Sequence, residues 1–410
     1  MNARMRAITR NNRQKSRDLA AYRRVADYVD FDNVFSLDCL DDAAKSCAKG
    51  CRWKAKVIDF MTFRTANCIK LAEKLKAGKY YPNKITKFYH MERGKKRLIT
   101  AVNFTDRVVQ KALCDNFLMP IFSNMLIYDN SASIKYKGIS FARNRVMEHL
   151  SKAKKYDELC VVVSDFHNYF GSISSSDAYN LFLLKMAHIL NHAKPYISND
   201  EFTKKVENLK KIFTIFEKII KKEPVLSLGS QVSQIAALYY LNRLDHEAGK
   251  YGYYARYMDD AYCLCENYQK ALEYRDFLRE QAKMSKLELN LKKTRIIRLY
   301  KGEKMPFLKR NYSISKDGRI HVSPNHKAYR YTINHIKRVI KVSDGSKIPP
   351  KIIYSMIGNA VNLYSDCDIK HKPEYIVNVL AKTMEKKGFY LSTNVDKWGL
   401  KCLQNKTQKK

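Results

Sequence analysis

The sequence predicts an α+β fold in which an antiparallel sheet is packed against helices. β-Forming residues flank the acids Asp259 and Asp260 on both sides, which predicts a hairpin with the two acids at its tip. The apolar run at residues 159–164 is typical of a buried strand. Residues 326–342 show the periodicity of an amphipathic helix, with one apolar stripe formed by Tyr329, Ile333, Ile336 and Ile340.

The acids at the hairpin tip indicate the chemistry. Adjacent carboxylates repel each other unless a cation neutralises them, and Mg²⁺ prefers such hard oxygen ligands. A further acid, Asp165, follows the predicted buried strand, where it could cap the next turn or lie beside the hairpin. Three converging carboxylates can hold two metal ions, which stabilise the attacking and leaving oxygens of a phosphoryl displacement. The sequence therefore predicts a two-Mg²⁺ site at Asp165, Asp259 and Asp260.

Several motifs occur in the order found in reverse transcriptases, a family that the chain resembles over roughly residues 75 to 315. They correspond to the fingers motif of bacterial enzymes, four palm motifs and the primer grip, and they lie at residues 94–99 with 106–113, 165–173, 228–234, 257–260, 289–294 and 307–309. The resemblance implies a right-hand polymerase with fingers, an antiparallel-sheet palm and a helical thumb.

The resemblance also implies catalytic roles. The three acids, together with the backbone carbonyl of Phe166, would ligate Mg²⁺. Arg97 would grip the triphosphate, helped by Lys96, because a guanidinium fork suits phosphate oxygens. Lys293 would protonate the leaving pyrophosphate, and its neighbour Lys292 has a nearly equal claim.

Phe170 and the primer grip complete the expected substrate contacts. Phe170 lies where the family places an aromatic ring beneath the sugar, and it cannot accept a hydrogen bond from a 2′-hydroxyl. It would therefore select deoxynucleotides, although a packing role in the core is the alternative. The expected primer grip consists of Phe307, Leu308 and Lys309.

The second palm motif departs from the commonest family pattern. Leu228-Gly229 stands where many relatives have Gln-Gly, and Ser233-Gln234 replaces Ser-Pro. Gly229 would let the backbone approach a nucleotide closely, with Ser233 and Gln234 nearby. This form resembles the enzymes of diversity-generating retroelements and bacterial reverse transcriptases linked to phage defence. Because Leu228 offers no polar contact to a base pair, low-fidelity copying is a hypothesis.

The motifs divide the chain into regions. Residues 1–74 are expected to form a basic helical N-terminal extension, residues 75–155 the fingers, and residues 156–305 the palm. A helical insertion at about 176–222 carries lysines that make a basic surface or a solvated helix face. Residues 306–410 would hold the primer grip, the helical thumb and a C-terminal tail.

Composition limits the partners. The chain has 77 Lys+Arg against 40 Asp+Glu, a net charge of +37, which implies a polyanionic partner and usually nucleic acid. No apolar run is long enough to span a bilayer, so no membrane partner is expected. Scattered cysteines fit a cytoplasmic protein. The expected partners are an RNA template, a DNA product or primer and dNTPs; a second copy or an accessory protein is left open.

The expected function is RNA-directed DNA synthesis on a dedicated structured non-coding RNA, with phage defence as the leading role by family analogy. Three alternatives stay open: an enzyme of a diversity-generating retroelement, a template-independent or protein-primed DNA polymerase, and a non-catalytic RNA-binding scaffold. The intact acids argue against the scaffold.

Overall fold

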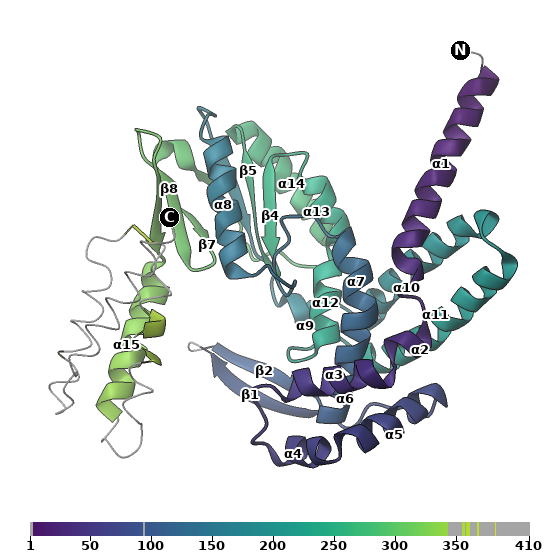
Figure 1. Cartoon of the computed structure of the whole chain (residues 1–410). Coiled ribbons are helices and arrows are strands. Elements are labelled where there is room, and N and C mark those ends of the chain that lie inside the picture. The colour runs from purple at the N-terminus through teal and green to yellow at the C-terminus, as the bar shows by residue number, and fades with distance from the viewer. Residues whose placement is uncertain are drawn as a thin grey trace, which may run out of the picture.

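The computed structural model describes residues 3–92 and 95–342, together with residues 355, 356, 358–360, 367, 368 and 382. Helices and antiparallel sheets alternate along the chain, which confirms the predicted α+β class (Figure 1). Apart from these few positions, the part of the predicted thumb and tail that follows residue 342 lies outside the described residues. No helix in the described ranges is long and apolar enough to cross a membrane.

The N-terminal extension is helical. It consists of α1 (Ala3–Ala26), α2 (Phe31–Val34), α3 (Leu37–Ala48), α4 (Ala55–Thr62) and α5 (Arg64–Lys76). Ser36 begins α3 by accepting a hydrogen bond from the Cys39 backbone N–H at 3.2 Å. The first turns of α1 project away from the rest of the molecule (Figure 1).

The predicted fingers region begins with the hairpin of β1 (Thr86–Glu92) and β2 (Lys95–Ala101), which pair antiparallel. Helical segments follow it: α6 (Phe104–Leu113), the π-helical turn η1 (Cys114–Leu118), α7 (Met119–Phe122), the 3₁₀ turn η2 (Ser123–Met125) and α8 (Ile139–Ala153).

The predicted palm sheet has the strand order β4-β5-β3-β6 and is antiparallel. Its strands are β3 (Cys160–Ser164), β4 (Tyr253–Tyr257), β5 (Asp260–Cys265) and β6 (Arg295–Arg298). Alternate residues of β3 enter two different cores: Val162 packs with Tyr274 of α14 (Tyr268–Met284), and Val161 packs with Val146 of α8. Both faces of the sheet are therefore covered, which explains why β3 is an uninterrupted apolar run.

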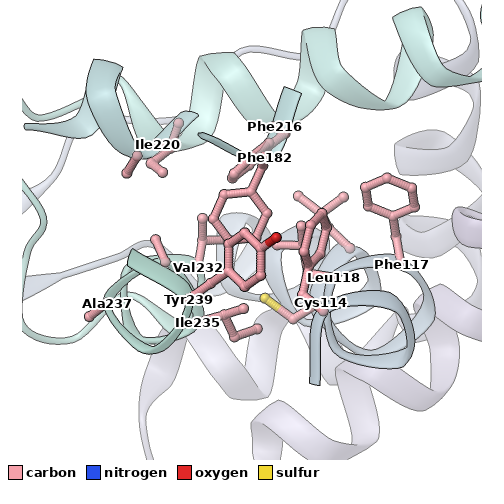
Figure 2. Close-up of a cluster of buried hydrophobic side chains, with 14 of the residues drawn as sticks. Cys114, Phe117, Leu118, Phe182, Phe216, Ile220, Val232, Ile235, Ala237 and Tyr239 are labelled. Carbon is pink, nitrogen blue, oxygen red and sulfur yellow. The ribbon is translucent and has the colours of Figure 1, made fainter. Parts of the chain in front are cut away.

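Helices α10 (Ser175–Ala193) and α11 (Asn199–Ile220), joined by the 3₁₀ turn η3 (Lys194–Tyr196), occupy the region of the predicted helical insertion. They are preceded by α9 (Tyr169–Ser172) and followed by α12 (Gln231–Tyr240) and α13 (Asn242–Ala248). Their shared core combines aromatic rings with aliphatic side chains (Figure 2). The ring of Phe182 lies 5.4 Å from that of Phe216 and 5.0 Å from that of Tyr239. The first pair is edge-on and the second is tilted, and together they fix how α10, α11 and α12 pack.

The lysines of α11 are only partly a solvated surface. The Lys205 ammonium donates to the carbonyl of Ala26 at 2.6 Å, at the end of α1. The Lys218 ammonium donates to the carbonyl of Tyr80 at 3.0 Å and lies over the Tyr81 ring. The insertion therefore contacts the N-terminal extension at Ala26 and the start of the predicted fingers region at Tyr80, a role that the charge pattern alone did not indicate.

The described range that ends at residue 342 closes with a third sheet followed by a helix. After the 3₁₀ turn η4 (Leu299–Lys301), the strands β7 (Met305–Phe307), β8 (Arg310–Ile314) and β9 (Ile320–Pro324) pair in that order, and α15 (His326–Val342) follows. The predicted apolar stripe of α15 is confirmed, because Ile333, Ile336 and Ile340 are buried.

Candidate active site

The strand register brings the three predicted acids to one end of the palm sheet. Ser164 of β3 pairs with Ala261 of β5, so the next residue on β3, Asp165, lies beside Asp260. Tyr257 pairs with Asp260, which leaves Met258 and Asp259 as a two-residue turn. The predicted hairpin is thus confirmed, and the acids from two distant segments are neighbours.

Asp165 is held by the segment that follows α14. Its carboxylate accepts from the Asn290 side-chain amide at 3.1 Å and from the Lys293 ammonium at 2.6 Å. Its backbone carbonyl accepts from the Asn290 N–H at 2.8 Å. Of the two candidate lysines, Lys293 is therefore the one that reaches the acids, whereas no contact of this kind is found for the exposed Lys292 in the described structure.

The three acids disturb one another electrostatically. Burial, followed by the charges of Asp259 and Asp165, raises the pKa of Asp260 to about 7. Burial first, and then Asp165, also raises the pKa of Asp259, while Lys293 and Arg97 act in the opposite direction. Burial lowers the pKa of Lys293, but the hydrogen bond to Asp165 and the neighbouring charges raise it above its ordinary value. The acids thus form a cluster with excess negative charge.

The donor chemistry of this cluster fits a divalent cation. Carboxylate oxygens are the ligands that Mg²⁺ prefers. A cation would relieve the mutual repulsion that, after burial, raises the pKa of Asp259 and Asp260. Within the described residues, however, no group of three or more His, Cys, Asp or Glu side chains is arranged to hold a metal ion as it stands. Lys293 binds one oxygen of Asp165, so a metal ion at this carboxylate would compete with the ammonium group.

Phe166 and Phe170 lie beside the acids but belong largely to the core. The Phe166 ring is 2% exposed, and its backbone pairs with Leu289 in an isolated bridge next to Asp165. Phe170 is partly buried against the same core, with its ring perpendicular to that of Tyr169 at 6.1 Å. Phe170 therefore packs in the core, and its expected role in sugar selection stays a prediction.

Arg97 and Lys96 point in opposite directions. They are neighbours on β2, where successive side chains project from opposite faces. Arg97 is near enough to Asp259 for its positive charge to oppose the rise in the pKa of that acid. The Lys96 ammonium instead lies over the Tyr89 ring at 4.1 Å. The expected help of Lys96 in triphosphate binding is therefore not supported by its position, because the pleat turns its side chain away from the face that carries Arg97.

The second palm motif mainly joins the fingers hairpin to the palm. Gly229 has φ 109°, and a Cβ there would lie 2.4 Å from the carbonyl oxygen of Thr100 in β2. The preceding carbonyl, that of Leu228, accepts from the Thr100 N–H at 2.9 Å. Ser233 is 5% exposed, and its hydroxyl accepts from the Ser227 N–H at 3.3 Å. Ser233 thus holds this turn, and its expected contact with the substrate stays a prediction.

Gln234 and Gly229 also line cavities that the sequence did not predict. A cavity of about 300 Å³ beside the second palm motif is lined by Gly229, Arg107 and Gln110, among others. A larger one of about 1060 Å³ extends toward Lys49 and Lys135. We call the two cavities together the groove, because both are lined by Ser46, Lys111, Gln231 and Gln234. The sequence feature that could have predicted the groove is the pair of cations Arg107 and Lys111 within the fingers motif.

The predicted primer grip is a hairpin tip. Phe307 of β7 pairs with Arg310 of β8, which leaves Leu308 and Lys309 as a two-residue turn. Both have positive φ, 45° and 65°, as a tight hairpin turn of this type requires. The Phe307 ring lies 5.0 Å from the ring of Tyr262. The turn is thereby anchored to β5, the strand that begins at Asp260.

Comparisons with known proteins identify the family of the chain. A family model described as "Reverse transcriptase (RNA-dependent DNA polymerase)" matches residues 82–333, more than half of the chain. Among solved structures, apo telomerase from Candida Tropicalis is similar with a TM-score of 0.41 and 10% identity, covering 80% of this chain and 67% of that chain. No curated protein matches the chain.

Proposed function

Because the chain belongs to the reverse transcriptase family, we propose that it copies a dedicated structured non-coding RNA into DNA by two-metal phosphoryl transfer. Membership makes it an RNA-directed DNA polymerase, a nucleotidyltransferase with the α+β polymerase fold. The observation that carries the proposal is the convergence of Asp165 with Asp259 and Asp260 at one end of the palm sheet.

The acids and their cationic neighbours have complementary roles in this reaction. The primer 3′-hydroxyl attacks the α-phosphorus of the dNTP, and pyrophosphate leaves. Bound Mg²⁺, held by Asp165, Asp259 and Asp260, would supply charge neutralisation for the attacking and leaving oxygens. Arg97 approaches the acids from β2 and binds the triphosphate. Lys293 keeps its proton at neutral pH and gives it to the leaving pyrophosphate once its pair with Asp165 has opened.

We infer that the groove binds the single-stranded RNA template. Its lining mixes amide and hydroxyl groups with cations and one carboxylate, that of Asp115, which pairs with Lys111 at 2.7 Å. Lys49 and Lys135 are exposed there. Cations that neutralise phosphates supply affinity independently of sequence, and amides can contact bases. The groove is lined by α3, α6 and α12, so the N-terminal extension takes part in the proposed path as well as the polymerase region.

The proposed dedication to one RNA rests on the N-terminal extension and on the second palm motif. Helices α1 to α5 precede the family match, and Arg13, Lys15 and Arg17 are exposed along α1. Leu228-Gly229 with Ser233-Gln234 resembles the motif of reverse transcriptases linked to phage defence. We therefore place the enzyme in the cytoplasm of a bacterium, in antiviral defence, with an accessory protein or a second copy as further partners.

A matched pair of double variants tests the catalytic part. Asp259→Ala with Asp260→Ala should abolish dNTP incorporation and leave RNA binding intact. Asp41→Ala with Asp42→Ala removes an equivalent acid pair on α3 and should leave incorporation unchanged. Incorporation that survives loss of the palm acids would contradict the proposed mechanism.

Sequencing of the nucleic acid that co-purifies with the protein tests the dedicated partner. The proposal predicts one predominant structured RNA, together with DNA complementary to part of it. A broad mixture of cellular RNAs would contradict a dedicated template, and DNA without a complementary RNA would favour template-independent synthesis.

A further inference from the structure

A buried ion pair lies directly behind the turn that carries Asp259. Arg256 of β4 is 0% exposed and Asp245 of α13 is 1% exposed. The Arg256 Nε donates to Asp245 Oδ1 at 2.7 Å, and Nη2 donates to Oδ2 at 2.6 Å. This is the two-pronged geometry that guanidinium and carboxylate groups favour. Because burial of such a pair often brings no net stability, its presence suggests a further role.

The other N–H groups of Arg256 reach two parts of the active site. Nη1 donates to the carbonyl of Met258, in the turn itself, at 3.0 Å. Nη2 also donates to the carbonyl of Leu238, in α12, at 2.6 Å. Helix α12 begins two residues after Gly229 of the second palm motif. One guanidinium therefore joins the turn between the catalytic acids to the helix that follows this motif.

The turn requires such support. Met258 has φ 57°, in the left-handed region that L residues with side chains rarely adopt. Residues held in such conformations persist only where their surroundings fix them, and they gather at functional sites. The carbonyl that Arg256 binds belongs to this residue, directly before Asp259. The strained residue and its support thus meet at the point that sets the direction of the acids.

We propose that Arg256 is a positioning residue for the catalytic turn. Asp245 orients the guanidinium, and the guanidinium fixes the Met258 carbonyl so that Asp259 and Asp260 stay directed toward Asp165. Arg256 is buried and acts through the turn rather than on the substrate. This inference rests on the proposed function of the acids. It adds that Arg256 and Asp245, behind the turn, hold these acids in place.

Arg256→Lys tests the proposal, because it keeps the charge but has a single donor nitrogen that cannot join Asp245, Leu238 and Met258. The assay is primer extension on poly(rA) with an oligo(dT) primer. Displacement of the acids should lower kcat about 100-fold. The KM for dTTP should stay within about threefold, because Arg97 and the groove are unaffected.

Tyr254→Phe is the matched control. The Tyr254 hydroxyl donates to Asp245 Oδ1 at 2.8 Å, so this variant weakens the same buried network without touching the turn. It should keep kcat within about threefold of the wild type. The proposal would be overturned if Arg256→Lys and Tyr254→Phe showed equal losses of kcat and equal decreases in Tm. The ion pair would then only stabilise the fold.

Two further measurements separate the positioning role from the chemistry. Amide hydrogen exchange in the peptide spanning residues 257–261 should rise about tenfold in Arg256→Lys and stay unchanged in Tyr254→Phe. Hydrogen exchange does not depend on catalysis, so it tests whether Arg256 holds the turn even if the acids proved dispensable. Unchanged exchange in the turn, or wild-type kcat in Arg256→Lys, would contradict the proposal.

A rescue variant adds an independent test. Met258→Gly removes the cost of positive φ, so adding it to Arg256→Lys should recover about tenfold of the lost kcat. If Met258→Gly did not restore kcat, the proposal that Arg256 supports the strained backbone of Met258 would be contradicted. If Arg256→Lys does not fold, Asp245→Asn, which loosens the orientation of the guanidinium, should show the same kcat decrease and faster exchange at the turn.

Discussion

Asp260→Asn should stabilise the metal-free protein while it abolishes catalysis. Burial and the charges of Asp259 and Asp165 raise the pKa of Asp260 to about 7, and only Lys293 opposes them among the groups that act on it. Above this pH the native protein must keep a charged carboxylate in an unfavourable place. Asparagine retains the shape and removes the charge.

The magnitude follows from the pKa shift. The shift from 3.8 to about 7 is roughly three units, and each unit is worth about 1.36 kcal/mol. Because the pKa is raised in the native state, Asp260 contributes stability that is present below pH 3.8 and is lost as the pH rises through about 7. The ceiling of this loss is about 4 kcal/mol, and screening by solvent reduces it to on the order of 2–4 kcal/mol.

Urea unfolding in EDTA measures the effect. At about pH 8, the free energy of unfolding of Asp260→Asn should exceed that of the wild type by on the order of 2–4 kcal/mol, and the difference should shrink toward about pH 4. Asp42→Asn, an exposed carboxylate with 78% side-chain exposure, is the control and should show no such gain. The electrostatic reasoning would be refuted if Asp260→Asn and the wild type had the same free energy of unfolding at pH 8. It would also be refuted if their difference did not change with pH.

Three further variants test other parts of the site. Lys293→Ala should lower kcat about 100-fold in primer extension and Lys292→Ala should not, because only Lys293 reaches Asp165; equal effects would contradict this assignment. Leu228→Gln should lower the error rate in a gap-filling assay, and an unchanged rate would remove the low-fidelity hypothesis. Lys49→Ala with Lys135→Ala should weaken binding of single-stranded RNA in filter binding and reduce the slope of log affinity against log salt by about 1.4. An unchanged slope would exclude the groove as the template path.

Local sequence patterns predicted those parts of the site that local structure determines. The hairpin at Tyr257 to Asp260 and the buried strand β3 follow from residue preferences over a few positions. The apolar stripe of α15 follows from helical periodicity. The register of β3 on β5 places Asp165 beside Asp260, but this register does not follow from the pattern of β3, because both of its faces are apolar.

Contacts between distant segments could not be predicted in this way. Lys96 and Arg97 are adjacent cations, and only the pleat of β2 against β1 separates their directions. Gly229 is explained by the backbone of Thr100, which is remote in sequence. The role of Arg256 depends on Asp245, on a different element, and nothing in the spacing of the two residues indicates a buried pair. Such contacts depend on the tertiary fold rather than on residue preferences.

Metal binding by Asp165 tests the central claim most directly. Mn²⁺ bound to the complex of protein, template, dideoxy-terminated primer and dNTP can be counted by electron paramagnetic resonance. The wild type and Asp177→Asn, which alters a partly exposed acid paired with Lys286, should bind two ions, and Asp165→Asn should lose at least one of them. Wild-type Mn²⁺ binding by Asp165→Asn would contradict a cation site that Asp165 shares with Asp259 and Asp260.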